Sequence, residues 1–221
     1  MPESSPFDTH AAEYDAWFDR FPNAYESELL AVRCVLPPRR DRWVEVGVGS
    51  GRFASRLGID VGVEPSEAMA RLARRRGIDV LAGRAEVLPL DAASAGAVFL
   101  ITTICFVQDL PLALGETRRI LQPDGFVLVA FIPRDSRFGR LYAAQGSENR
   151  FFERARLRSV DEVDRRLADA GFEVDRTIQT LTGDPAAADE RVEIPSPGSG
   201  RGSFVVLRGR APGSAATSKE A

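Results

Sequence analysis

The sequence predicts an α/β protein built on a doubly wound, mostly parallel sheet of seven strands with an antiparallel C-terminal hairpin. From about residue 43 onward, strand-like apolar runs alternate with helix-like segments, and this alternation requires right-handed crossovers between parallel strands. The run AGAVFLITT is apolar almost throughout, as in a central strand that helices cover on both faces. Two more strand-like runs near the C-terminus favour the hairpin at one edge of the sheet.

The first predicted element is a helical region from about His10 to Leu36. Its apolar residues recur at spacings of three and four and form one stripe, which contains Tyr25, Leu29, Val32 and Leu36. The Pro37–Pro38 pair ends this helix, because proline cannot continue it. We therefore expect an N-terminal helical segment over residues 1–40, the α/β domain over 41–210 and a disordered tail over 211–221.

The elements of the α/β domain follow in order. The predicted ranges are strand Trp43–Val46, helix Arg52–Leu57, strand Val61–Val63, helix Ser66–Arg76, strand Ile78–Leu81, strand Ala95–Thr103, helix Pro111–Leu121 and strand Phe126–Ile132. The turn QPDG separates the last two. A further helix is predicted in SVDEVDRRLADAGF, because Ser159 and Glu162 have capping-box spacing and Gly171 follows the last turn. The final strands are Glu173–Leu181 and Ser203–Arg208.

Composition narrows the class of protein. A chain of 221 residues with 44% hydrophobic residues fits one large domain, and a net charge of −3 gives no general attraction to nucleic acid or anionic lipid. Cys34 and Cys105 lie far apart, so neither disulfides nor a metal site are expected. The N-terminus lacks a leader pattern, and no run approaches the roughly 18 apolar residues of a membrane span. We expect a cytoplasmic protein with a small-molecule substrate; the oligomeric state is left open.

The stretch WVEVGVGSGRFA is a strand that ends on glycines and opens a helix, which is typical of a nucleotide-like ligand site. The dinucleotide fingerprint requires glycines at its first, third and sixth positions. Here Gly47, Gly49 and Gly51 alternate, and the sixth position is Arg52. A pyrophosphate therefore fits less well than a cofactor with an amino-acid tail. The alternative is a tight turn with a purely structural purpose.

Glu64 ends the next predicted strand, seventeen positions after Gly47. In a doubly wound sheet this position lies over the same edge as the glycine turn, where a carboxylate can accept hydrogen bonds from both ribose hydroxyls. The alternative is a solvated glutamate at a strand end.

Four blocks carry a resemblance to a known family. VEVGVGSGRFA, GVEPSEAM, GRAEVLPL and ILQPDGFVLVAF occur in the order and spacing of class I S-adenosyl-L-methionine-dependent methyltransferases. The sequence most resembles the small-molecule branch that includes the ubiquinone and menaquinone biosynthesis methyltransferases, over about Phe7 to Phe172. The resemblance implies a Rossmann-like fold, S-adenosyl-L-methionine as cofactor and methyl transfer to a small molecule.

The resemblance also implies roles for individual residues. It places Gly47, Val48 and Gly49 at the methionine part of the cofactor, with Glu45 orienting the amino group, Glu64 at the ribose, Pro65 and Met69 beside the adenine, the backbone of Ala85 and Glu86 at the adenine edge, and Thr102 and Thr103 near the methionine amine. Tyr14, in AAEYDAWF, matches a Tyr-Asp pair that folds over the cofactor in similar enzymes. This match makes residues 1–40 a helical lid, with core packing of Tyr14 as the alternative.

Two departures from the family limit this transfer of roles. Arg84 stands where an aspartate commonly reads the adenine amino group, and Cys105 and Phe106 stand where many relatives carry a histidine pair. No histidine base can therefore be carried over. The remaining catalytic candidates are His10, the only histidine, and Tyr14.

Other charged or reactive side chains have simpler explanations. Cys105 has apolar neighbours and is expected to be a small buried hydrophobe. Arg134 and Arg137 follow the fifth strand and could receive an anionic acceptor or be solvated. The run Arg74–Arg76 ends a helix, where cations complement the dipole without a partner.

Two rival functions remain open at this point. One is a cofactor-binding protein without catalysis, and the other is an NAD-dependent oxidoreductase, which Arg52 and the lack of a Tyr-x-x-x-Lys pair disfavour. The acceptor atom is not predicted.

Overall fold

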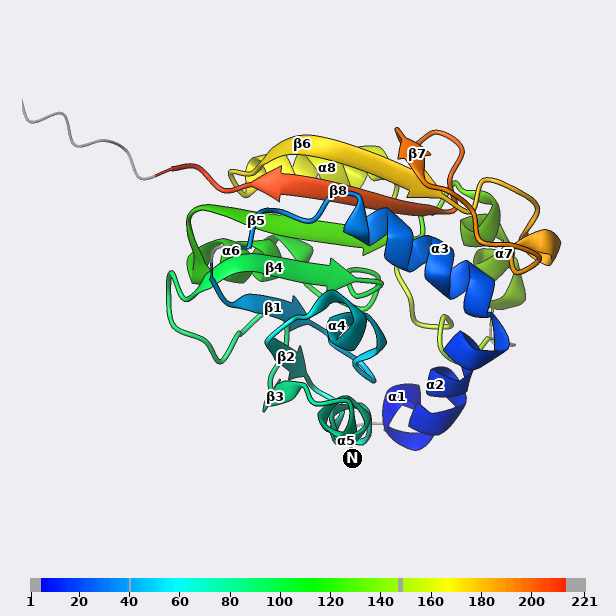
Figure 1. Ribbon diagram of the computed structural model, residues 1–221, viewed down its shortest axis with the longest axis horizontal. Coiled ribbons are helices and arrows are strands. Elements are labelled where there is room, and N and C mark those ends of the chain that lie inside the picture. The colour runs from blue at the N-terminus through cyan, green and yellow to red at the C-terminus, as the bar shows by residue number, and fades with distance from the viewer. Residues whose placement is uncertain (1–4, 40, 147–148, 214–221) are drawn as a thin grey trace, which may run out of the picture.

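The computed structural model describes residues 5–39, 41–146 and 149–213. It contains one sheet of eight strands in the order β3-β2-β1-β4-β5-β8-β6-β7 (Figure 1). The parallel strands are β1 (Trp43–Val46), β2 (Val61–Glu64), β3 (Asp79–Ala82), β4 (Ala95–Ile101) and β5 (Leu121–Phe131). The antiparallel strands are β6 (Glu173–Thr180), β7 (Ser196–Pro197) and β8 (Phe204–Arg210). The predicted fold class is confirmed, and the additional strand is the two-residue β7 at the edge.

Helices cover both faces of this sheet. On one face lie α3 (Pro22–Arg33), α4 (Arg52–Leu57) and α5 (Glu67–Arg75), and on the other α6 (Leu110–Ile120) and α8 (Val160–Asp169) (Figure 1). Each face of the sheet packs against its helices in a separate hydrophobic cluster, and strand β4 contributes to both. Phe99 belongs to the cluster with α3, α4 and α5, and Val98 and Leu100 belong to the cluster with α6 and α8. This explains its unbroken apolar sequence, because both sides of the strand are removed from water.

The predicted N-terminal helical region consists of three separate helices. The structure divides it into α1 (Pro6–Thr9), α2 (Ala11–Arg20) and α3. Phe21 leaves the helical conformation, with φ −125° and ψ 63°, because the residue before a proline is driven out of the α region. Pro22 then begins α3, a position that its fixed φ suits. Helix α3 ends at Arg33, before the Pro37–Pro38 pair is reached.

The later elements match the prediction more closely. Helix α8 has both of its end signals, since the Ser159 hydroxyl accepts from the Glu162 amide and Gly171 has φ +84° after the last turn. The QPDG turn is a bulge within β5, whose Leu121 pairs with Ala95 and whose Phe126 pairs with Ala97.

The structure contains two short elements that the sequence did not predict. Helix α7 (Arg137–Gln145) was not predicted, although Ser136 caps it, and a short 3₁₀ turn lies at Pro185–Ala187. Residues 214–221 of the predicted tail lie outside the described residues. Within the described chain, no helix is both long and apolar enough to span a membrane.

Candidate functional site

The turn after β1 brings the three glycines of the motif to the edge where the parallel strands end. The amides of Gly47 and Val48 both donate to the carbonyl of Val63, at 2.7 and 3.2 Å, which fixes the turn against β2. All three glycines have positive φ: +70° at Gly47, +54° at Gly49 and +79° at Gly51. This left-handed backbone strongly favours glycine.

The space around each glycine indicates whether that position needs glycine for packing or for the approach of a ligand. A Cβ on Gly47 would lie 2.5 Å from Cγ2 of Thr103, and one on Gly51 would lie 3.0 Å from Cα of Ala73. A Cβ on Gly49 would meet nothing within 4 Å. The structural explanation therefore accounts for Gly47 and Gly51, whereas Gly49 borders open space that a ligand can enter.

Glu64 is buried at the end of β2, and not a solvated strand-end residue. Its Oε2 accepts from the Gly49 amide at 2.8 Å and its Oε1 accepts from the Ser66 amide at 3.0 Å. Burial raises the pKa of this carboxyl, and the two amide hydrogen bonds oppose the rise. The carboxylate is thus held directly beside the open face of the glycine turn.

Glu45, in the middle of β1, has a buried oxygen without a partner. The residue is 2% exposed, and its Oε2 makes no hydrogen bond within the described chain. Burial, reinforced by the charge of Glu64, raises its pKa well above the ordinary range. An unpaired buried carboxylate oxygen is costly, so a ligand that supplies a donor here would relieve that cost.

Thr102 and Thr103 lie at the end of β4, opposite the glycine turn. Thr102 has φ +52°, which is a rare conformation for a β-branched residue and is typical of functional sites. The Thr103 hydroxyl donates to the carbonyls of Ile101 at 3.0 Å and Gly47 at 3.4 Å. Burial raises the pKa of the Cys105 thiol to about 12, so this cysteine stays protonated, as expected of a buried hydrophobe.

The residues expected around the adenine flank this edge. Met69 is buried in the first turn of α5, and Pro65 is exposed just before it. Ala85 is buried, and the Glu86 carboxylate accepts from the Gln108 amide at 2.9 Å. Arg84 is exposed and pairs with Glu86 at 3.5 Å.

Helices α1 and α2, which we call the N-terminal cover, lie across the ends of β2 and β4. The Phe7 carbonyl accepts from the Ser66 hydroxyl at 3.1 Å, and the Phe7 ring meets Tyr14 and Phe106 edge-to-face at centroid distances of 5.3 and 5.0 Å. Burial raises the pKa of Tyr14, whose hydroxyl interacts with the Thr102 side chain. Figure 1 shows the cover beside α5.

Two arginines fasten α2 to the sheet domain. Asp15 accepts from Arg52 through Nε at 2.9 Å and Nη2 at 3.0 Å, and from Arg76 through Nη2 at 2.8 Å. Although partial burial acts to raise the pKa of Asp15, the hydrogen bonds from the two arginines lower it to about 2. Arg52 also pairs with Asp19 at 2.6 Å. The expectation that Arg74–Arg76 need no partner is wrong, since Arg76 holds Asp15 and Arg74 pairs with Glu67.

His10 lies away from this edge. Its ring contacts Glu13 at 3.4 Å and the Arg150 guanidinium at 3.2 Å, and it is partly exposed. These contacts are typical of a polar surface residue. Neither of them connects His10 to the residues at the ends of the strands.

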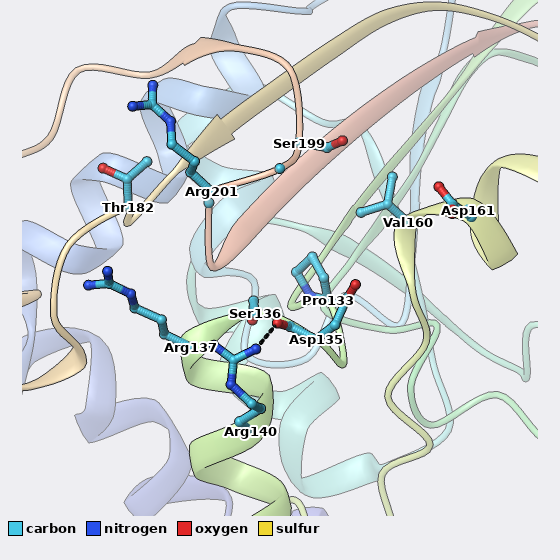
Figure 2. A pocket seen from close by; sticks show the side chains of 12 residues that line it. Pro133, Asp135, Ser136, Arg137, Arg140, Val160, Asp161, Thr182, Ser199 and Arg201 are labelled. Carbon is cyan, nitrogen blue, oxygen red and sulfur yellow. Dashed lines mark hydrogen bonds between the residues drawn. The ribbon is translucent and has the colours of Figure 1, made fainter.

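The arginines after β5 separate into two environments. Arg134 lies 3.9 Å from Glu162. Arg137 lines a cavity of about 420 Å³ together with Arg140 and Arg201 (Figure 2). Asp135 and Asp161 also line this cavity, so it has mixed charge. In the part of the chain that the structure describes, no cluster of metal-binding side chains occurs.

Comparison with known proteins decides the family. A family model described as a methyltransferase domain matches residues 44–129. A solved Thermotoga maritima protein is 44% identical, with a TM-score of 0.88, and the match covers 92% of this chain and 97% of that one. It is described as a SAM-dependent methyltransferase, possible histamine N-methyltransferase. The chain belongs to the class I S-adenosylmethionine-dependent methyltransferases.

Other relatives of this methyltransferase are more distant. An uncharacterized protein of Methanocaldococcus jannaschii is 33% identical over 201 residues, which are 91% of this chain and 96% of that protein. The geranyl diphosphate C-methyltransferase of Streptomyces coelicolor, solved with S-adenosyl-L-homocysteine, is 22% identical and has a TM-score of 0.62, with 95% of this chain and 85% of that one covered. At that identity the likeness concerns the fold. The predicted enzyme class and cofactor are confirmed, and the oxidoreductase and non-catalytic alternatives are set aside.

Two features of the methyltransferase were missed from the sequence. The Asp15–Arg52–Arg76 cluster joins three helices, and its members carry no common motif. Glu28, on α3, is buried, although it belongs to a helix whose other carboxylate, Glu26, pairs with arginines near the surface. Neither feature has a signal in the sequence that we could have used.

Proposed function

We propose that this methyltransferase transfers the methyl group of S-adenosylmethionine to a small-molecule acceptor enclosed by the N-terminal cover. The observation that carries the proposal is the packing of aromatic rings from distant segments over the end of β4: Phe7 and Tyr14 from the cover, Phe106 after β4, and Phe151. Rings packed over this edge would keep a folded macromolecule away from the reacting atoms, which favours a small-molecule acceptor.

The residues at this edge fit the cofactor. The unpaired Oε2 of Glu45 suits an ammonium group, directly or through water, and the Glu64 carboxylate suits two ribose hydroxyls. Open space at Gly49 permits close approach of the methionine part. We assign Val48 to the same turn, Thr102 and Thr103 to the neighbourhood of the methionine amine, and Pro65, Met69, Ala85 and Glu86 to the adenine. The aspartate that relatives use for the adenine amino group is replaced by Arg84, so backbone atoms must carry that contact.

The chemistry makes modest demands on the protein. When bound, S-adenosylmethionine supplies a methyl group on a positively charged sulfur that is already activated for in-line displacement. The protein must align the acceptor and exclude water. Tyr14 and Phe7 close the edge from above, and the Asp15 cluster holds them in place. We propose residues 1–40 as the lid, with α2 as its moving part, because α3 packs into the core through Leu29 and Val32.

The acceptor class is a separate proposal. Because the Thermotoga maritima relative is described as a possible histamine N-methyltransferase, we propose small amines as the first class of acceptor to assay. Quinone-type acceptors, suggested by the sequence resemblance, form the second class. We propose no nucleic acid, membrane or metal as a partner.

A ligand panel tests the proposal. The melting temperature of the full chain is measured with S-adenosylmethionine, S-adenosylhomocysteine, NAD and NADP. A ligand at a hundredfold its Kd stabilises the folded state by about 2.7 kcal/mol, or roughly 5 to 10 °C for a chain of this size. We expect this shift with the first two compounds. A shift with NAD or NADP alone would refute the cofactor assignment, and failure of every small acceptor to become methylated would refute the acceptor proposal.

A further inference from the structure

The cavity of about 420 Å³ beside α7 lies at the edge of the sheet where the parallel strands end. The Thr102 amide, just after β4, donates to the Ala130 carbonyl of β5 at 2.7 Å. Pro133, which lines the cavity, follows Ala130 by three residues. None of the residues that we assign to the cofactor lines this cavity. We call it the arginine cavity, because its lining includes Arg137, Arg140 and Arg201 (Figure 2).

The protein does not neutralise the three guanidinium groups of this cavity. Among the described residues, none of them forms an ion pair, and only Arg140 donates a side-chain hydrogen bond, to the carbonyl of Asp135. The carboxylates of Asp135 and Asp161 also line the cavity and form no ion pair within the described chain. In Figure 2 the guanidinium groups of Arg137 and Arg201 lie on the side opposite Asp161. Positive charge that stays unpaired in a hollow attracts an anion.

A glycine-rich loop, residues 199–202 with the sequence SGRG, forms another wall of the arginine cavity. The amides of Ser199 and Gly200 donate no hydrogen bond within the described residues. Gly200 has no positive φ, and a Cβ there would meet nothing within 4 Å. Neither packing nor backbone conformation therefore requires glycine at this position, and the missing side chain keeps the backbone accessible. Free amides in such a turn are typical donors to phosphate.

A buried glutamine holds this loop in place. Gln179, at the end of β6, is 5% exposed. Its Oε1 accepts from the amides of Arg201 at 2.8 Å and Gly202 at 2.7 Å, and its Nε2 donates to the Pro197 carbonyl at 3.1 Å. A Cβ on Gly202 would lie 2.6 Å from Cβ of Gln179, so only glycine permits this approach. The loop is thus preorganised, which lowers the entropy that a ligand must spend on ordering it.

Helix α7, which carries Arg137, is fixed to the same elements. A Cβ on Gly139 would collide with the Pro133 carbonyl, so the helix packs directly on the backbone that follows β5. The Phe138 amide donates to the hydroxyl of Ser203, a buried residue, at 3.4 Å, which joins the first turn of α7 to the start of β8. The two backbones that carry the arginines therefore border the cavity in fixed positions, and only the side chains must adjust to a ligand.

We propose that the arginine cavity binds the phosphate group of a small molecule, through the arginine side chains and the free amides of residues 199 and 200. Guanidinium and amide donors match a phosphate, whose oxygens accept several hydrogen bonds at once. Asp135 and Asp161 disfavour further negative charge in the same cavity, so a single phosphate suits it better than a polyanion. The inference is independent of the proposed acceptor, because the cavity and the candidate cofactor site share no residue.

NMR titration of the full chain tests the proposal, with inorganic phosphate and phosphoethanolamine as probes and acetate as the carboxylate. Salt at about 0.15 M screens general attraction. We expect the amide signals of Ser199 and Gly200 to shift saturably with both phosphates. Arg137→Gln and Arg201→Gln change exposed side chains, so they should stay folded and raise Kd about tenfold each. Arg134→Gln is the matched control, because Arg134 lies beside the cavity without lining it, and it should keep the affinity of the wild type.

Gly200→Val separates the loop from general charge. It should weaken phosphate binding without lowering the melting temperature, since its Cβ meets nothing. Equal phosphate affinity in the wild type and both arginine-cavity variants would overturn the proposal, as would an equal loss in Arg134→Gln or acetate binding as tightly as phosphate. Competition between phosphate and S-adenosylhomocysteine would place the phosphate in the cofactor site and also overturn it. Failure of S-adenosylhomocysteine to bind would instead refute the proposed function and leave this inference intact.

Discussion

Replacing Asp15 with asparagine is expected to release the N-terminal cover from the sheet domain without unfolding the protein. The carboxylate receives three charged hydrogen bonds of 2.8 to 3.0 Å from Arg52 and Arg76. The amide of asparagine carries no charge and offers one acceptor oxygen in place of two. Phe18, packed at 5.0 Å from Tyr25 and 6.1 Å from Phe53, keeps the end of α2 attached to the core.

The size of the effect follows from the pKa of Asp15. A pKa lowered from 3.8 to about 2 corresponds to roughly 2 kcal/mol at about 1.4 kcal/mol per unit. Solvent screens part of this, because the side chains of Asp15 and Arg76 are 15% and 24% exposed, so about 1 to 2 kcal/mol remains. Since the folded-state pKa lies below the ordinary value, the contribution is present above about pH 4 and is lost as pH falls towards 2.

Amide hydrogen exchange of residues 11–20 measures this opening directly. A loss of 1 to 2 kcal/mol speeds exchange by roughly five- to thirtyfold where opening is local, and the wild type with S-adenosylhomocysteine should show the slowest exchange. Asp19→Asn is the control, because Asp19 also pairs with Arg52 but is 69% exposed, and it should change exchange less. If exchange in Asp15→Asn equals that of the wild type, or if Asp19→Asn matches it, the cluster does not hold the cover.

Three other substitutions test the assignments. Glu64→Ala should weaken S-adenosylmethionine binding by about ten- to a hundredfold, since it removes charged hydrogen bonds; calorimetry measures it, and unchanged affinity contradicts the ribose role. Gly49→Val should abolish binding while the chain stays folded, whereas Gly51→Ala should lower the melting temperature because its Cβ meets Ala73; circular dichroism and calorimetry distinguish the two, and normal cofactor binding by Gly49→Val refutes the ligand role. The wild type should lose about 4 kcal/mol of stability between pH 4.5 and pH 8, because the folded-state pKa of Glu28 is raised to about 8 and this carboxyl must ionise in that range. Glu28→Gln should not show this loss. Urea unfolding at several pH values measures it, and parallel pH profiles of wild type and variant would contradict it.

The order of elements was readable from the sequence because periodicity is a local property of the chain. Strand β1 and helix α4 begin and end where the apolar runs predict. The placement of Gly49 and Glu64 at one edge also followed, because parallel strands joined by right-handed crossovers end on the same side of a sheet. The positions of Glu45 and Thr102 in the candidate site came from the family resemblance, and the roles of all these residues toward the cofactor stay predictions.

The N-terminal region shows where local patterns fall short. The apolar stripe of Tyr25, Leu29, Val32 and Leu36 predicted a helical region but not its division, which occurs where Phe21 leaves the helical conformation before Pro22. Helix α7 was missed although Ser136 is an ordinary capping residue and Phe138, Leu141 and Tyr142 have helical spacing, because a helix of nine residues carries only one such repeat.

The sequence by itself determined the class of fold, the glycine turn and the acidic residue that ends the second strand. The tertiary structure alone decided that Asp15 meets Arg52 and Arg76, and that Glu28 is buried. The physical reason is that a side chain's partner and its exposure depend on segments distant in the chain. Helix α3, which carries Glu28, packs against strands β6 and β8, and these strands form from the end of the chain.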